Sequence, residues 1–201
     1  MMKLVVNAWE LDPEFKYEIA STPGGEHIMR CFQCSTCTAS CPVAEIVPSY
    51  NPRKIIRMSL LGMKNEVLSS DEIWICAICQ MCTERCPQDV RISDVMGAIR
   101  QIAEKEAERG NVEIKSVRPV FEKAFMHQIE KYGRLYEIGL SMEYYKNVHR
   151  GLILAMMELK KDFAKLGMRL YKKGKMGVKS MLPERIKRTD EVKKIFESIG
   201  D

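Results

Sequence analysis

Cysteine is absent from all but two short stretches of this sequence, and long apolar runs are absent altogether. The best candidate for a membrane segment, GLILAMM at residues 151–157, is followed at once by Glu158, Lys160 and Lys161. A helix that crosses a bilayer needs about 20 mostly apolar residues. We therefore expect no membrane association. The N-terminal MMKLVVNAWELDPEF turns acidic too early for a secretory signal, which favours a cytoplasmic protein.

Glycine motifs for nucleotide binding are also absent. The sequence has neither G-x-G-x-x-G nor a Walker A loop, because GKMGVKS at residues 174–180 lacks the glycine that should precede its Lys-Ser pair. The histidines at positions 27, 127 and 149 lie outside the cysteine stretches, which argues against a Rieske centre. With every cysteine in the two stretches, no thiol remains as a nucleophile. We expect no substrate site and no catalytic residue on this chain.

The formal net charge of +5 counts every cysteine as neutral. Metal-bound cysteines are thiolates, and two oxidised four-iron clusters would bring the sum to about +1. The basic composition is therefore no argument for a nucleic-acid partner, and we expect none. The basic stretch KKGKMGVKSMLPERIKR at residues 172–188 is most simply a solvated face, and alternatively a docking surface for an acidic partner.

Helix signals dominate the rest of the chain, so the expected fold class is mainly α. Asn51 and Pro52 are typical of a helix start, and Gly62 of its end. Further starts are expected at Asp12-Pro13, Ser69-Ser70-Asp71, Ser93 and Pro119, with amphipathic helices at about 148–172 and at 190–198. We divide the chain into an N-terminal segment (1–25), a helical ferredoxin-type domain (26–112) and a helical C-terminal extension for partner docking (113–201).

The two cysteine stretches repeat one spacing. Residues 31–42 read CFQCSTCTASCP and residues 76–87 read CAICQMCTERCP. This C-x2-C-x2-C-x3-C-P run is the bacterial ferredoxin spacing, in which the fourth cysteine binds the other cluster of a pair. The proline after the fourth cysteine turns that residue away from its own loop. We therefore assign cluster one to Cys31, Cys34, Cys37 and Cys86, and cluster two to Cys76, Cys79, Cys82 and Cys41.

The doubled spacing predicts two 4Fe-4S clusters in a helical ferredoxin-like domain. The alternative is a pair of four-cysteine zinc sites, although these usually combine two separate Cys-x-x-Cys pairs. A disulfide framework is disfavoured because the chain lacks a secretory signal and is long enough to bury a core.

Two sets of neighbours would tune such clusters. An apolar set would exclude water and lower the reduction potential, and a basic set would raise it if it points inward. The alternative for both sets is an ordinary role in core or surface. The apolar set is Phe32, Trp74, Ile75 and Ile78, and the basic set is Arg30, Arg85 and Arg91.

Together the two runs, the spacer NPRKIIRMSLLG (51–62), SSDEIWICAICQMC (69–82) and KKGKMGVKSMLPERIK (172–187) resemble the C subunit of heterodisulfide reductase from methanogenic archaea. The resemblance covers most of the chain. It implies two 4Fe-4S clusters held by the eight cysteines, and an electron-transfer role within an oxidoreductase complex that acts in methanogenesis. The cysteine spacing alone is shared with a wider group of iron-sulfur proteins.

The resemblance also implies partners. Electrons would pass from the flavin-containing A subunit of heterodisulfide reductase to its B subunit, which carries CCG motifs and reduces the mixed disulfide of coenzyme M and coenzyme B. No Cys-Cys pair occurs here, which agrees with a relay. A separate chain of this kind resembles the soluble complex, which couples with a hydrogenase or formate dehydrogenase and bifurcates electrons at the flavin.

Two other functions remain open at this point. The chain could serve a flavin oxidoreductase that acts on succinate, fumarate, a hydroxy acid or glycerol phosphate, although such families often add a plant-type 2Fe-2S domain or fused CCG modules. It could also be a structural adaptor whose metal only stabilises a helical scaffold, since zinc has no redox step.

The first expected outcome concerns metal content. Protein purified without oxygen should contain about eight iron and about eight labile sulfide per chain, because two four-iron clusters require that amount. Elemental analysis and sulfide determination measure both. Native protein that contained zinc alone would contradict the assignment.

Overall fold

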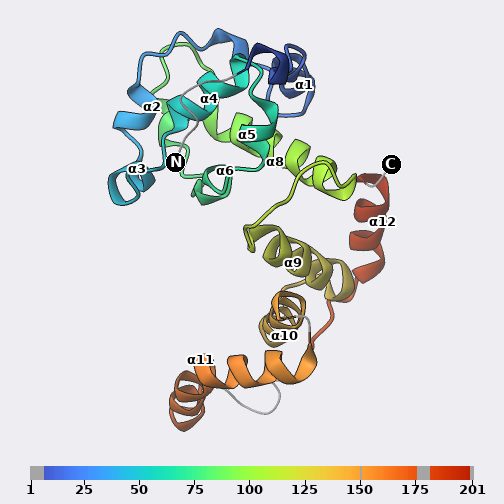
Figure 1. Ribbon diagram of the computed structural model, residues 1–201. Helices are drawn as coiled ribbons and strands as arrows, with labels where there is room; N and C mark the ends of the chain where they lie inside the picture. The colour runs from blue at the N-terminus through green and yellow to red at the C-terminus, as the bar shows by residue number, and fades with distance from the viewer. Residues whose placement is uncertain (1–6, 150, 176–181, 200–201) are drawn as a thin grey trace. The chain divides into compact units, whose positions relative to one another are not determined.

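The computed structural model describes residues 7–149, 151–175 and 182–199. The chain divides into two compact units, unit 1 up to Ser116 and unit 2 from Val117 (Figure 1). Every regular element within the described ranges is helical, which confirms the mainly-α fold class. None of the helices described is long and apolar enough to cross a membrane. The GKMGVKS segment from residue 176, and with it the middle of the basic stretch, lies outside the described residues.

Unit 1 consists of short helices around one long helix, α8 (Ile92–Glu108). The other elements of the unit, in chain order, are η1 (Ala8–Glu10), α1 (Phe15–Ser21), η2 (Ile28–Arg30), α2 (Thr36–Ala39), α3 (Pro42–Ile46), α4 (Pro52–Leu60), α5 (Lys64–Leu68), α6 (Glu72–Ile75) and α7 (Met81–Glu84). The first cysteine run includes α2 and the start of α3, and the second includes α7.

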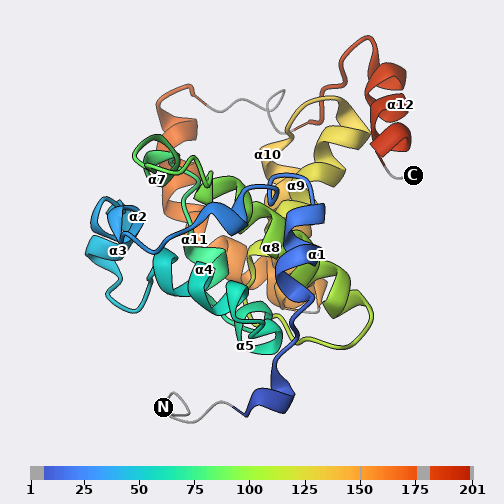
Figure 2. The same cartoon turned by 90° about the horizontal axis from the view of Figure 1, so that it is seen from above.

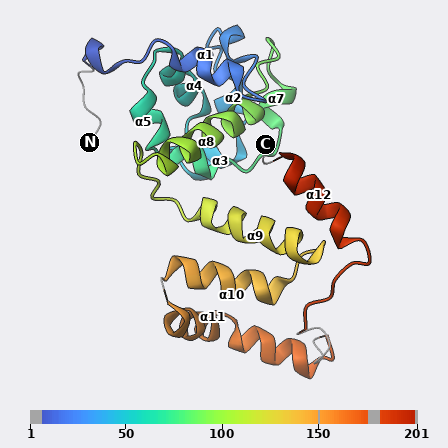
Figure 3. The ribbon, with the colours of Figure 1, turned by 90° about the vertical axis from the view of Figure 1, so that its right-hand side faces the viewer.

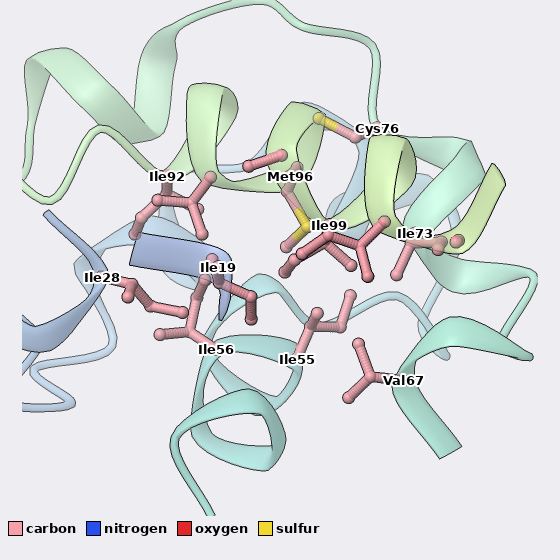
Figure 4. Close-up of a cluster of buried hydrophobic side chains, with 14 of the residues drawn as sticks. Ile19, Ile28, Ile55, Ile56, Val67, Ile73, Cys76, Ile92, Met96 and Ile99 are labelled. Carbon is pink, nitrogen blue, oxygen red and sulfur yellow. The ribbon is translucent and has the colours of Figure 1, made fainter. Parts of the chain in front are cut away.

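Helix α8 forms the centre of the core of unit 1. Figure 2 shows α1, α4 and α5 gathered along it. Its Met96 and Ile99 point toward Ile19 of α1 and toward Ile55 and Ile56 of α4 (Figure 4). All five side chains are buried. Each such burial contributes about 1.5–3 kcal/mol to folding, so α8 holds α1 and α4 together. It also contacts α6 and α7, which lie before and within the second cysteine run.

The predicted limits of helix α4 are confirmed. The Asn51 side chain accepts a hydrogen bond from the backbone N–H of Lys54 at 3.0 Å, and Pro52 is the first helical residue. Gly62 ends the helix with φ at +81°. A side chain there would collide with the backbone of Asp12, whose N–H donates to the Gly62 carbonyl at 2.7 Å. The N-terminal segment is thereby tied to the end of α4.

Other predicted helix starts need correction. Ser93 does not cap α8, because the helix begins at Ile92 and Arg91 holds the cap position in a left-handed conformation. The hydroxyl of Ser93 is buried instead and has no hydrogen-bond partner within the described residues. Of Ser69-Ser70-Asp71, only Ser70 acts as expected, accepting from the N–H of Glu72 at 3.0 Å.

Unit 2 contains α9 (Arg118–Tyr132), α10 (Glu137–Val148), α11 (Leu152–Lys172) and α12 (Thr189–Ile199). Helix α10 packs against both α9 and α11, and α12 packs against α9. Figure 3 shows α9, α10 and α11 as successive layers. The expected helix starts near Pro119 and residue 190 are confirmed, but the helix expected from residue 148 begins only after Gly151, and α10 was missed.

Aromatic and polar contacts hold the layers of unit 2, whose buried core is small. Phe121 of α9 meets Tyr144 of α10 edge to face, with ring centroids 5.9 Å apart. The Tyr145 hydroxyl donates to Asp162 of α11 at 2.6 Å. Helix α11 nevertheless leaves a row of apolar side chains exposed, namely Ile153, Leu154, Met156, Met157, Phe163, Leu166, Met168 and Tyr171.

A buried carboxylate fastens the end of α8 to its neighbours. Glu106 accepts from Asn111 at 2.7 Å and from Arg109 at 2.9 Å, and Lys64 of α5 lies 3.9 Å away. Lys64 also pairs with Glu18 of α1 at 2.8 Å. The hydrogen bond from Asn111, with the charges of Lys64 and Arg109, holds the pKa of Glu106 below its ordinary value.

Glu106→Gln should lower the free energy of unfolding of unit 1 by about 1–3 kcal/mol, because it weakens hydrogen bonds to a charged group. Urea unfolding followed by the fluorescence of buried Trp74 reports on this unit when exposed Trp9 is replaced by Phe, since unit 2 has no tryptophan.

The pH dependence of that loss follows from the direction of the pKa shift. A lowered folded pKa stabilises the protein fully above the unfolded value of about 4.3, and this stabilisation is lost as pH falls through the folded pKa. The loss in Glu106→Gln should therefore be equal at about pH 6 and about pH 8. A loss that differed between these two values would contradict the assignment to Glu106.

Candidate metal centres

The two cysteine loops share an unusual backbone conformation. Gln33 and Ser35 in the first loop have positive φ, and so do Ile78 and Gln80 at the matching positions of the second. None of the four is glycine, and the left-handed region costs an ordinary residue about 1–2 kcal/mol. Turns of this kind direct successive backbone N–H groups to one side, where they favour an anion. Such strain is concentrated at functional sites.

The N–H groups of these loops are not used by the helical ladders. Within the described residues, no N–H of residues 32–37 or 77–82 donates to a backbone carbonyl. Each loop then continues into a single-turn helix, α2 after the first and α7 after the second. The loops therefore present donors that suit a negatively charged group.

Each loop forms one wall of a hollow, and the other run supplies a further cysteine. The first hollow contains about 300 Å³ of empty space, its opening to solvent included, and the second about 340 Å³. The cysteines that line the first hollow are Cys31, Cys34, Cys37 and Cys86. Those that line the second are Cys76, Cys79, Cys82 and Cys41.

The crossing of the fourth cysteine has a local cause. Cys41 has an extended backbone, with φ −82° and ψ 117°, because a residue before proline avoids the helical region. Pro42 then begins α3, so Cys41 leaves the loop of its own run. Cys86 likewise precedes a proline and lies in the first hollow.

Several donors reach the cysteine sulfurs. The Gln33 side chain lies 3.3 Å from the sulfur of Cys31, and the N–H of Val90 lies 3.4 Å from that of Cys86. The hydroxyl of buried Tyr50 donates a hydrogen bond to the Cys76 side chain. Burial first, and then the neighbouring Cys76, raise the pKa of Tyr50, so it stays a neutral donor.

Buried contacts also fix the loops to the core. Arg100 of α8 donates from Nε to the carbonyl of Ile73 at 2.7 Å and from Nη2 to that of Cys76 at 3.1 Å. In the first run, the Thr38 hydroxyl donates to Asn51 at 3.0 Å and accepts from the N–H of Arg53 at 3.2 Å. Sequence patterns singled out neither Tyr50 nor Arg100, because no spacing rule links them to the cysteines.

Most of the apolar and basic residues that were expected to tune the clusters are exposed to solvent. Trp74 is buried, but Phe32, Ile75 and Ile78 are 59%, 38% and 48% exposed, so these three do not seal the cysteines from water. The basic set is exposed as well. Arg30 and Arg91 lie 3.7 Å and 3.3 Å from Asp89, and they do not point inward.

The thiols differ in their readiness to ionise. Hydrogen bonds from the side chain and backbone of Thr36 lower the pKa of exposed Cys34. Burial raises the pKa of Cys37, and it raises the pKa of Cys82 to about 11. Binding of a metal would therefore have to release protons from the buried thiols.

The residues present fit iron-sulfur clusters. Soft thiolates are the donors that such clusters take, and each hollow has four cysteines together with inward donors. The side chains of His, Cys, Asp and Glu that the structure describes nowhere converge in threes around a single metal ion. The cysteines are instead spread along the walls of a hollow.

Comparison with known proteins also finds a 4Fe-4S domain. Residues 27–90, which contain all eight cysteines, match the 4Fe-4S dicluster domain family. The C subunit of the H2:CoB-CoM heterodisulfide,ferredoxin reductase of Methanothermobacter thermautotrophicus is 41% identical over 101 residues, 50% of this chain and 54% of that protein.

Two further relatives extend the similarity. The C2 subunit of the H2/formate:CoB-CoM heterodisulfide,ferredoxin reductase of Methanococcus maripaludis is 43% identical over 115 residues, 54% of this chain and 60% of that protein. The iron-sulfur C subunit of the CoB-CoM heterodisulfide reductase of Methanopyrus kandleri is 39% identical over 109 residues, 51% of this chain and 56% of that protein. The chain thus spans about half the length of the curated relatives it matches. Residues 27–90 of unit 1 thus match a 4Fe-4S dicluster domain, and the chain is similar over about half its length to C subunits of heterodisulfide reductases.

Proposed function

We propose that each hollow holds one 4Fe-4S cluster, with three cysteines from one run and the fourth from the other. The first site would consist of Cys31, Cys34, Cys37 and Cys86, and the second of Cys76, Cys79, Cys82 and Cys41. The support is the grouping of these cysteines around two hollows and the donors aimed at their sulfurs.

We further propose that the chain relays electrons through these two sites. A 4Fe-4S cluster, when bound, takes up and releases one electron. The observation that carries this proposal is Ile92, whose buried side chain lines both hollows. Because one side chain lines both hollows, the two sites are close neighbours. Electron transfer from one site to the other requires such proximity. The chain supplies thiolates and hydrogen-bond donors, and we propose no substrate site within its described residues.

The relatives are named as C subunits of heterodisulfide reductases, which supports an assembly of that kind for the proposed partners. The flavin-containing A subunit of a heterodisulfide reductase would donate electrons, and its CCG-motif B subunit would accept them and reduce the heterodisulfide of coenzyme M and coenzyme B. The assembly would be cytoplasmic and would receive electrons from a hydrogenase or a formate dehydrogenase, with bifurcation at the flavin. The names of the M. thermautotrophicus and M. maripaludis relatives include hydrogen and, in the second, formate.

The crossed ligation makes a prediction that an uncrossed arrangement does not share. Cys86→Ala should damage the cluster held by the first loop, because its fourth ligand comes from the second run. Cys41→Ala should damage the other cluster. Electron paramagnetic resonance of the reduced variants measures which cluster is altered, with Cys34→Ala and Cys79→Ala as reference variants for each site.

In the crossed arrangement the spectrum of Cys86→Ala matches that of Cys34→Ala, and the spectrum of Cys41→Ala matches that of Cys79→Ala. The opposite pairing would mean that each run binds its own cluster.

The partner assignment is tested by gentle purification from native cells without oxygen, followed by mass spectrometry of every chain that remains bound. We expect a flavin-binding, cluster-rich chain and a chain with CCG motifs. A succinate, hydroxy-acid or glycerol-phosphate flavoprotein in their place would overturn the heterodisulfide assignment and leave the two-cluster relay standing.

A further inference from the structure

The two hollows are related by the internal repeat, but their walls are chemically different. Positions 45 residues apart correspond, so residues of one wall can be compared with those of the other. Thr36 lines the first hollow where Met81 lines the second, and Gln88 lines the first where Val43 lines the second. Each matched pair places a polar side chain at the first site and an apolar one at the second.

The donors at the loops follow the same asymmetry. Gln33 lines the first hollow and directs its amide to the sulfur of Cys31 at 3.3 Å. The matching residue of the second loop is Ile78, which has no side-chain donor. The N–H of Val90 adds a second donor at the first site, 3.4 Å from the sulfur of Cys86.

Arg53 adds a positive charge to the first hollow. Its side chain is half-buried and lines that hollow, at the start of α4. Among the described residues no carboxylate lies within ion-pair distance of it. The described lining of the second hollow contains no charged side chain other than its cysteines. The guanidinium is therefore available to a negative group in the first hollow alone.

The second hollow has donors of its own, but none of them is charged. Tyr50 donates to the side chain of Cys76, and the buried hydroxyl of Ser93 lines the same wall. The Arg100 guanidinium donates to the carbonyls of Ile73 and Cys76 and does not line the hollow. The remaining wall is mostly apolar, with Met81, Met96 and Val43.

We infer that the two sites are electronically unequal and that Arg53, with Gln33, gives the first site the higher reduction potential. Reduction adds one negative charge, which cations and hydrogen-bond donors stabilise and an apolar wall destabilises. One electron that reaches the second site therefore moves on to the first, which oxidises the second site and reduces the first without breaking a bond. This inference rests on the proposed two-cluster relay.

The test is a redox titration of the full chain, purified without oxygen and followed by electron paramagnetic resonance. The wild type should show two separate one-electron couples. Arg53→Gln should lower the reduction potential of the upper couple by about 59 mV. A change of that size shifts the distribution of one electron between the sites about tenfold toward the second site. Arg53→Lys keeps the charge and should retain most of the separation. Gln33→Met independently removes the amide that donates to the sulfur of Cys31. It should lower the reduction potential of the same couple by a smaller amount.

The matched control lies in the other hollow. Tyr50→Phe removes the donor to Cys76 and should lower the lower couple while the upper one stays in place. Coincident couples in the wild type would overturn the inference, as would a shift of the lower couple in Arg53→Gln and Gln33→Met. Those results would leave the relay intact, whereas a chain without two clusters would overturn the relay itself.

Discussion

Each hollow takes a cysteine from the other run, so neither loop can complete its site alone. This crossing constrains the whole of unit 1, because residues 43–75 must bring the second run back beside the first. The Thr38–Asn51 bond ties the first run to the start of α4, and Arg100 ties the second run to α8. The buried face of α8 then holds both halves in register. Formation of the site and packing of the core are consequently one process.

The loops themselves work against folding. Four non-glycine residues adopt left-handed backbone conformations in them, which costs about 1–2 kcal/mol for each residue. The raised pKa values of Cys37 and Cys82 add a cost on metal binding, because both thiols must then lose their protons. The apolar core around α8 offsets the backbone cost, and the bonds between thiolates and metal would offset the loss of protons.

Local rules in the sequence were enough for some parts of this fold. The cap at Asn51, the stop at Gly62 and the start at Pro119 are set by neighbouring residues, and all three are confirmed. Tyr50 and Arg100 were missed because their roles depend on partners 26 and 24 residues away in the chain, which no spacing rule connects. Ser93 was misread because a buried serine and a capping serine look alike in sequence. The cysteine ligation itself stays a prediction until a loaded protein is measured.

Exposure of two cysteines has a consequence for handling the protein in air. Cys34 and Cys79 are exposed, whereas Cys37 and Cys76 are buried. Oxidation of a free cysteine sulfur depends on its exposure to solvent and on its thiolate character. Cys34 has both, because it is exposed and its pKa is lowered. In the metal-free chain, oxidation by peroxide should therefore begin at these two exposed thiols, with Cys34 first.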